Sequence, residues 1–350
     1  MLTISVSLAA ASFWGSLLPG PYRVGLRVET MTGGGGAPIQ VVWTFPTVEE
    51  GKPWTLGALI DATCEEPGQP SPPSSRTACR RTFLDALAQY GRAETPIMDR
   101  RIASARGVTP VPDRRPLIVF DAGLRSDALS YFALAEFLSS HGYICVSAPS
   151  LPFAADKPLT LDEAGIRWKA DQIGRVIRLA RQHSSVDPSR IGLAAWSVGG
   201  VTTAIVAKSS GARALISLDG GLGYDYGPPL ARRVLGTGSI LEVPTLHVTG
   251  TAANPFPGPK TFAAFDSATV SHVYRAEIAA INHSHFVAHA GVVRYSSDTS
   301  SDAAQFWRAN EAVARLVLLF ADTFIAERAP TAEFAARAGQ LSPDVLRIVR

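Results

Sequence analysis

Apolar residues occur along this chain in short continuous runs that alternate with stretches in which they recur every three or four positions. Runs of this kind are typical of strands buried on both faces of a sheet, and the second pattern is typical of amphipathic helices. We expect strands at 22–30, 37–46, 116–120, 142–149, 187–196, 212–220, 243–250 and 271–279, and helices at 128–140, 162–183, 201–210 and 309–328. The alternation predicts an α/β fold with a mostly parallel central sheet and helices on both faces.

The chain is expected to form one large domain with an irregular segment inside it, and it has a further segment at each end. Residues 21–328 are expected to form the domain, and residues 329–350 a peripheral tail. From about residue 50 to 115 the sequence is rich in proline and charge, which predicts an insertion or a cap in the N-terminal half of the domain. Residues 1–20 are largely apolar and have no charged side chain. They predict a leader or signal segment of a secreted or periplasmic protein, and because no basic residues precede the apolar ones, a cytoplasmic location is the alternative.

Composition narrows the classes of function. The chain has 350 residues, of which 46% are hydrophobic and 18% charged, so a sizeable core can form. The formal net charge is +3 and the Lys and Arg residues are scattered, so no nucleic-acid partner is predicted. No apolar run is long enough to span a bilayer, and no Cys and His residues have zinc-like spacing. We therefore expect no stable membrane span, no metal and no cofactor, and the oligomeric state stays open.

Three cysteines bear on the redox environment. Cys64 and Cys79 flank a loop rich in Pro and Ser, which they could close as a disulfide in an oxidising compartment. Cys145 lies in an apolar run and is predicted to be a buried core thiol.

The stretch AAWSVGG contains the first candidate for chemistry, Ser197. It follows an expected strand and opens an expected helix, with Ala195 two positions before it and Gly199 two positions after it. This context is typical of a nucleophile elbow, although Ser and Gly are also common in ordinary turns. The N-terminus of the helix would favour developing negative charge, and the backbone N–H of Val198 would point at an oxyanion.

An oxyanion hole needs a second N–H donor, which the loop after the third strand usually supplies. Here that loop is DAGLRSDALSY, and the N–H of Leu124 is the candidate. The alternative is a plain turn at Gly123, since glycine is routine in such loops.

A serine nucleophile also needs a base and a carboxylate that orients it. The stretch AINHSHFVAHAG follows the last expected strand and contains His283, His285 and His289, of which His283 is favoured and His285 is the runner-up. The loop GTAANPFPG lacks a carboxylate, whereas the strand after the elbow helix ends in Asp219. Asp219 is therefore the expected acid, with an ordinary Asp-Gly turn as the alternative.

These stretches resemble the α/β-hydrolase superfamily, and within it the platelet-activating-factor acetylhydrolase and dienelactone-hydrolase-like esterases. The resemblance covers about residues 20–328 and rests on GPYRVGLRVE, PLIVFDAGLRSDALSYFALAEFLSSHGYICVSAP, SRIGLAAWSVGG, ALISLDGG and INHSHF. It implies a serine hydrolase that cleaves small-molecule carboxylic esters through an acyl-enzyme, with a triad of Ser197, His283 and Asp219. In the acetylhydrolase group the histidine is followed three residues later by Phe, which Phe286 matches, and an Xaa-Leu position like that of Leu124 donates to the oxyanion.

Two positions depart from the family pattern. Members usually have His-Gly where this chain has Ala122 and Gly123, preceded by Asp121, whose carboxylate must point away from an oxyanion hole. Ala195 replaces the first glycine of the elbow, which adds only a methyl group. The same machinery also serves peptidases, thioesterases and acyltransferases, and a non-catalytic binding module can retain the fold.

Overall fold

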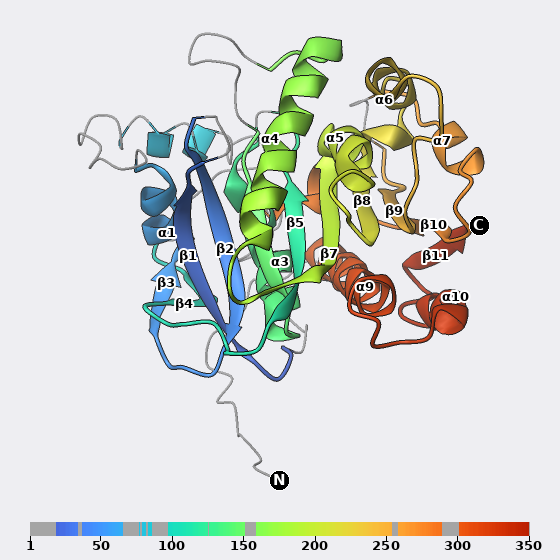
Figure 1. Ribbon diagram of the computed structural model, residues 1–350. Coiled ribbons are helices and arrows are strands. Elements are labelled where there is room, and N and C mark those ends of the chain that lie inside the picture. Colours follow the sequence, from blue (N-terminus) through green and yellow to red (C-terminus); the bar gives the residue numbers. More distant parts are fainter. Residues whose placement is uncertain are drawn as a thin grey trace.

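The computed structural model describes residues 19–33, 37–65, 77, 79–81, 83–85, 97–124, 126–150, 159–253, 258–288 and 301–349. Within this part of the chain, one sheet runs through the molecule in the order β11-β10-β9-β8-β7-β5-β6-β2-β1-β4-β3 (Figure 1). Its strands are β1 (Arg23–Met31), β2 (Ile39–Thr47), β3 (Lys52–Thr55), β4 (Arg101–Arg106), β5 (Arg115–Asp121), β6 (Ile144–Ala148), β7 (Val186–Ser197), β8 (Ala214–Gly220), β9 (Thr245–Gly250), β10 (Val273–Ile278) and β11 (Leu346–Val349).

The centre of the sheet is parallel, as the sequence pattern predicts. Strands β6, β5, β7, β8, β9 and β10 are parallel neighbours in that order. The hairpin of β1 and β2 is antiparallel and joins β6 through β2. The carboxyl ends of the parallel strands therefore meet at one edge of the sheet, which is where ligands bind in open α/β sheets.

Helices cover both faces of the sheet (Figure 1). They are α1 (Leu56–Thr63), α3 (Phe132–Ser140), α4 (Glu163–Arg181), α5 (Gly199–Ala207), α6 (Gly227–Leu235), α7 (Ala263–Asp266), α9 (Ser301–Phe324) and α10 (Phe334–Gly339), with short 3-10 turns η2 (Ala128–Tyr131), η3 (Gly221–Gly223), η4 (His283–Phe286) and η5 (Thr331–Glu333). In β5, Ile118 and Phe120 belong to the core beneath α3 and α9, whereas Leu117 and Val119 belong to the core beneath α4 and α5. Burial on both faces is why this strand is a continuous apolar run.

The segment from about residue 50 to 115 contributes two strands that its sequence pattern does not predict. Strand β4 lies beside β1 through the pair of Gly25 and Ala105, and β3 pairs with β4 in antiparallel fashion at the edge of the sheet. Along β4, exposed Arg101 is followed by buried Ile102, an alternation that is usual where one face of a sheet is solvated. The middle of this segment and residues 1–18 of the expected leader lie outside the described residues.

The tail expected to be peripheral also enters the fold. It contains α10 and β11, and β11 pairs with β10 in antiparallel fashion. Phe334 is fully buried in the core beneath α9, and Leu346 is buried beside it. A short strand such as LRIV has too few positions for its period to be recognised in the sequence.

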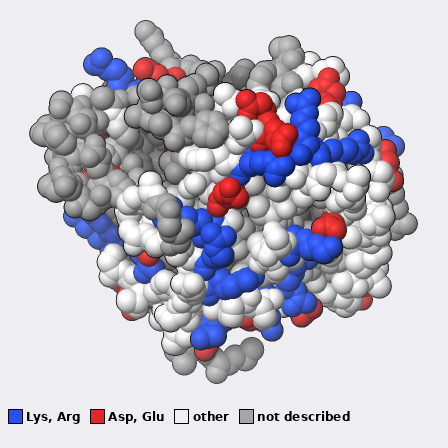
Figure 2. Space-filling model, turned by 45° about the horizontal axis from the view of Figure 1, so that its top comes forward, with Lys and Arg blue, Asp and Glu red and all other residues white. Residues whose placement is uncertain are grey.

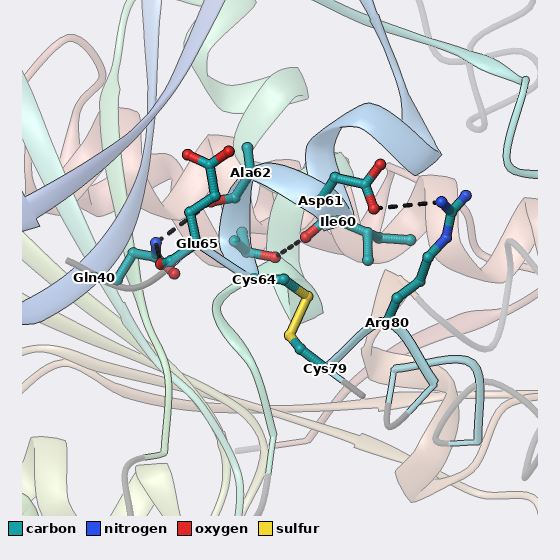
Figure 3. The surroundings of a disulfide bond; sticks show 9 residues. Gln40, Ile60, Asp61, Ala62, Cys64, Glu65, Cys79 and Arg80 are labelled. Carbon is teal, nitrogen blue, oxygen red and sulfur yellow. Dashed lines mark hydrogen bonds and ion pairs between the residues drawn. A yellow bond between two sulfur atoms is a disulfide. The ribbon is translucent and has the colours of Figure 1, made fainter. Parts of the chain in front are cut away.

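The disulfide that the sequence allowed is present (Figure 3). Cys64 caps the C-terminus of α1 and is bonded to Cys79, with their Cα atoms 5.6 Å apart, while Cys145 is a buried free thiol. Burial raises the pKa of the Cys145 thiol to about 12. The bond ties the end of α1 to Cys79, and the apolar cluster that contains Cys64 also includes Leu129 and Phe132, which follow the loop at 122–127.

Candidate active site

Ser197 stands at a strained turn between β7 and α5. Its backbone φ is 56°, in the left-handed region that non-glycine residues rarely adopt, and its relative exposure is 6%. A Cβ atom on Gly199 would lie 2.5 Å from the carbonyl oxygen of Asp121, so only glycine allows α5 to begin this close to β5. Strain of this kind persists where the surrounding structure enforces it and is concentrated at functional sites.

Asp219 lies on the neighbouring strand, at an irregularity in the pairing of β7 with β8. Trp196 is opposite Leu218, but Ser197 is opposite Gly220, so Asp219 is an extra residue between two pairs. Its φ is 45°, also left-handed. A bulge re-aims the side chain of the inserted residue, which explains how a residue of a regular strand comes to face the loop that contains His283.

The Asp219 carboxylate is held by a buried set of hydrogen bonds. His283 Nδ1 lies 2.8 Å from its Oδ2 atom, Thr249 Oγ1 donates to Oδ1 over 2.6 Å, and the Tyr224 hydroxyl donates to Oδ2 over 2.5 Å. Lys260 Nζ in turn donates to Thr249 Oγ1 over 2.8 Å. Burial alone would raise the pKa of Asp219, but the hydrogen bond and charge of His283, together with Thr249 and Tyr224, hold this pKa below its usual value. The lowered pKa favours the ionised carboxylate, which can accept a hydrogen bond from a protonated His283 Nδ1.

The loop that contains His283 is fixed against the residue that precedes Ser197. The indole Nε1 of Trp196 donates to the carbonyl oxygen of His283 over 2.7 Å, and the two rings lie 4.7 Å apart between centroids. His283 is 3% exposed. The structure thus places His283 beside the Ser197 turn and bonds it to Asp219.

The other histidines of this loop are placed differently. His285 Nδ1 accepts a hydrogen bond from the backbone N–H of Asn282 over 3.2 Å, and its ring packs edge-on against Phe306. These contacts stabilise the start of η4 rather than the Asp219 carboxylate. His289 lies outside the described residues.

The expected oxyanion loop lies against the serine. A Cβ atom on Gly123 would be 2.4 Å from the Trp196 ring and 3.1 Å from Ser197 Cβ, so Gly123 is in close contact with the elbow. Leu124 is half-buried and packs on the core of the α4 and α5 face. Val198 precedes the first turn of α5, where backbone N–H groups are free of helical partners. The backbone N–H groups of Leu124 and Val198 remain the predicted oxyanion donors.

Asp121 points away from this loop, as an oxyanion hole requires. Its carboxylate is buried on the face covered by α4 and α5, where Lys169 Nζ and Thr202 Oγ1 donate to it. Burial raises the pKa of Asp121, and the Lys169 charge opposes that effect. The backbone carbonyl of Asp121 accepts from the Tyr131 hydroxyl over 2.8 Å, and that hydroxyl accepts from the Trp196 N–H over 2.7 Å. Asp121 therefore connects β5, α4 and α5 beneath the elbow.

The structure adds site residues that sequence reasoning did not select. Trp196 contacts both Gly123 and His283, and Tyr224 binds Asp219. Tyr226 lies in the same turn, and its ring stacks on that of Tyr224. The stretch GLGYDYG directly follows the acid, which is a positional signal, but no motif distinguishes its tyrosines from core aromatics.

Membrane-spanning helices and metal clusters are not found in the described part of the chain. There, no helix combines the length and apolar character needed to cross a bilayer, and no three His, Cys, Asp or Glu side chains are grouped in a way that suits a metal ion. On the face in Figure 2, Lys and Arg side chains are interspersed with Asp and Glu.

Comparison with known proteins identifies the fold. A solved structure of a ferulic acid esterase from Streptomyces cinnamoneus is similar to this chain with a TM-score of 0.64 and 17% sequence identity, over 96% of this chain and 98% of the esterase chain. No protein-family model matches the chain, and no curated protein matches it. Given this likeness, the parallel sheet and the helices on both its faces, the chain has the α/β-hydrolase fold.

Proposed function

We propose that the protein is a serine hydrolase that cleaves small-molecule carboxylic esters through an acyl-enzyme intermediate. The observation that carries the proposal is the buried 2.8 Å contact between His283 and Asp219 beside the strained turn at Ser197. A carboxylate bonded to one ring nitrogen of a histidine leaves the other nitrogen to accept a proton, which is the arrangement that activates a serine.

In this mechanism Ser197 Oγ attacks the ester carbonyl while His283 Nε2 takes its proton. Asp219 keeps the other proton on Nδ1 and stabilises the imidazolium ion that forms. The N–H groups of Leu124 and Val198 donate to the oxyanion, and the N-terminus of α5 adds a favourable field. His283 then protonates the leaving alcohol, and a water molecule activated by the same histidine releases the acid. None of these steps needs a metal or an organic cofactor.

The test is labelling with a fluorophosphonate probe, combined with hydrolysis of p-nitrophenyl acetate. We expect the label on Ser197, and Ser197→Ala should lower kcat by on the order of 10⁴ or more. Ser217 provides a control because its Oγ lies 2.9 Å from His247 Nδ1, and both residues are fully buried. Ser217→Ala should retain the label. Folded wild-type protein that takes no label would favour a non-catalytic binding module.

A panel of substrates tests which acyl groups and which leaving groups the protein accepts, and whether water or an added alcohol receives the acyl group. Short acyl esters are the first substrates to test, because the chain resembles the acetylhydrolase and dienelactone-hydrolase-like esterases, including Phe286 after His283. The likeness to a ferulic acid esterase adds feruloyl esters. Thioesters and peptides distinguish the thioesterase and peptidase alternatives, and added alcohols reveal acyl transfer.

We also propose that the protein works in an oxidising compartment after export. The disulfide between Cys64 and Cys79 supports this location, because such bonds persist in secreted and periplasmic proteins and are rare in the cytoplasm.

A further inference from the structure

The hydroxyl of Tyr131 joins two backbone groups next to the proposed nucleophile. It donates to the carbonyl oxygen of Asp121 over 2.8 Å and accepts from the N–H of Trp196 over 2.7 Å. A phenol has one proton to donate and lone pairs that accept, so a single hydroxyl serves both backbone groups. The contact therefore joins the last residue of β5 to the residue before Ser197.

This link lies where the pairing of β5 with β7 ends. The last pair of the two parallel strands is Asp121 opposite Ala195. Beyond it β7 stays paired with β8 up to Ser197, whereas the chain after Asp121 enters the loop at 122–127. The distance between that loop and Ser197 is therefore set by contacts outside the strand pairing, and the phenol makes one of them.

The loop that begins after Asp121 passes close to the elbow. A Cβ atom on Gly123 would lie 2.4 Å from the Trp196 ring and 3.1 Å from Ser197 Cβ. A Cβ atom on Gly199 would lie 2.5 Å from the carbonyl oxygen of Asp121, which is the atom that the phenol binds. A shift of that carbonyl group would therefore move the loop against the residues on both sides of Ser197.

The Tyr131 side chain is itself fixed in place. It is 2% exposed, it ends the 3-10 turn η2, and its ring lies 4.8 Å from that of Phe120 between centroids. The Asp127 carboxylate caps η2 by accepting from the N–H of Leu129 over 2.8 Å. Burial is the largest cause that raises the pKa of Tyr131 well above its usual value, so the phenol remains a donor at neutral pH.

We propose that Tyr131 is a positioning residue that sets the distance between Ser197 and the oxyanion donor of the loop at 122–127. The inference rests on the acyl-enzyme mechanism proposed above, in which the N–H groups of Leu124 and Val198 bind the oxyanion. The phenol is buried and acts through the two backbone groups that it binds.

Removal of the phenol should change kcat and leave KM unchanged. In Tyr131→Phe the N–H of Trp196 and the carbonyl group of Asp121 lose their common partner, so the two backbones shift relative to each other. An oxyanion forms in acylation and again in deacylation, and loss of one oxyanion donor lowers kcat by about 10²–10³. Displacement of a donor should cost less, about 10- to 100-fold. Because both half-reactions slow together, KM should change by less than about twofold.

The experiment combines hydrolysis of p-nitrophenyl acetate with inhibition by phenylboronic acid. Ser197 Oγ forms a bond to boron, its proton passes to His283, and boron keeps both hydroxyl groups and carries the negative charge, so one oxygen takes the place of the oxyanion. The inhibition constant of Tyr131→Phe should rise by the same factor by which kcat falls. Titration with the fluorophosphonate probe gives kcat per reactive site. A smaller folded fraction would lower total activity but leave the inhibition constant unchanged.

Tyr143→Phe is the matched control. Tyr143 is also buried, and its phenol donates to Asp322 over 2.7 Å, but it precedes β6 at the amino end of that strand, away from the edge of the sheet at which Ser197 lies. Each substitution removes a buried phenol, so the melting temperature should fall in both variants. Tyr143→Phe should keep the wild-type kcat per site and the wild-type inhibition constant.

Hydrogen exchange of the wild-type protein tests the contact without any substitution. The amide of Trp196 should exchange only when the whole protein unfolds, because the buried phenol accepts its hydrogen bond. Fast exchange of this amide overturns the proposal, even if Tyr131→Phe fails to fold.

The outcomes are distinguishable from failure of the proposed function. Wild-type protein that neither takes the label on Ser197 nor releases p-nitrophenol overturns the hydrolase mechanism, and the role of Tyr131 with it. If the wild type is active but Tyr131→Phe keeps its kcat per site, the role of Tyr131 is wrong while the hydrolase proposal stands. The same holds if kcat falls while phenylboronic acid inhibits the variant as well as the wild type.

Discussion

The indole nitrogen of Trp196 donates to the carbonyl oxygen of His283, so the residue before the proposed nucleophile holds the loop of the proposed base. We predict that Trp196→Phe lowers kcat/KM for p-nitrophenyl acetate by about 10-fold, because the loss of one buried hydrogen bond corresponds to about 1–3 kcal/mol. Steady-state kinetics checks this value.

Trp54 is a matched control for that substitution. It is 8% exposed, like Trp196, and its indole nitrogen donates to the carbonyl oxygen of Leu26 over 2.9 Å at the far edge of the sheet. Trp54→Phe should lower the melting temperature to a similar extent but leave kcat/KM unchanged. Equal losses of activity in both variants would show that Trp196 acts through stability alone.

Asp219→Asn tests the acid. The amide keeps the size of the side chain but favours the wrong histidine tautomer, so kcat should fall by roughly 10⁴ with little change in KM. The contact with Tyr224 and Thr249 should keep the variant folded, which circular dichroism checks. A folded variant with nearly full kcat would make Asp225 and Asp266 the carboxylates to test next.

Separate alanine replacements distinguish the two histidines of η4. His283→Ala should abolish turnover, because it removes the group bonded to Asp219. His285→Ala should retain most of kcat but lower the melting temperature, since it removes a contact with the Asn282 N–H and with Phe306. The reverse pattern of activities would make His285 the base.

Reduction of the disulfide should destabilise the protein. The bond closes a loop of 15 residues, which corresponds to about 3 kcal/mol of stabilisation. Replacing Cys64 and Cys79 together by Ser should lower the free energy of unfolding by about that amount. Thiol counting on denatured, unreduced protein from its native compartment should find one free thiol, Cys145. Three free thiols would refute the proposed oxidising location.

Stability should depend on pH through His247. Burial is the main cause that lowers the pKa of this histidine from 6.5 to about 4. The unfolded chain therefore binds the proton more tightly, and the stabilisation present above pH 6.5 is lost as the pH falls towards 4. Relative to His247→Gln, the wild type should lose on the order of 3 kcal/mol between these values, measured by chemical denaturation.

Glu136 provides the opposite control. Burial raises its pKa from 4.5 to about 7, although the Ser104 hydroxyl and N–H both donate to its carboxylate. Here the folded protein binds the proton more tightly, so stability is lost as the pH rises from 4.5 to 7. Relative to Glu136→Gln, the wild type should therefore lose stability towards high pH. If both differences change in the same direction with pH, one of the two assignments is wrong.

The parallel strands could be predicted because a strand that is buried on both faces is a nearly continuous run of apolar residues, as in PLIVF at 116–120 and ALISL at 214–218. Strand β4 is not predicted because RIASAR has two arginines and a buried Ser104, whose polar groups are bonded to Glu136. Helix α6 is not predicted because GPPLARRVL has two prolines near its start, which suit the first turn of a helix but are also typical of a loop.

The candidate site, like the fold, could be predicted from the sequence only in part. Ser197 could be selected as a candidate because an elbow requires small residues at fixed positions, and Asp219 because the alternative loop GTAANPFPG has no carboxylate. The bulge that aims Asp219 depends on pairing between strands, which one sequence does not display. Lys169 has the sequence context of an ordinary charged residue of a helix, yet it is 3% exposed and bonded to Asp121. Such pairs join residues far apart in the sequence, and no local pattern marks them.

The contact between Gly123 and Trp196 has a consequence for protein engineering. A Cβ atom at position 123 would lie 2.4 Å from the indole ring, so a side chain at this position would clash with Trp196. A mutant library that randomises position 123 alone would therefore return mostly displaced loops. A library that also allows a small residue at position 196 makes room for a side chain at position 123, and variants with an altered surface beside Ser197 should be sought there.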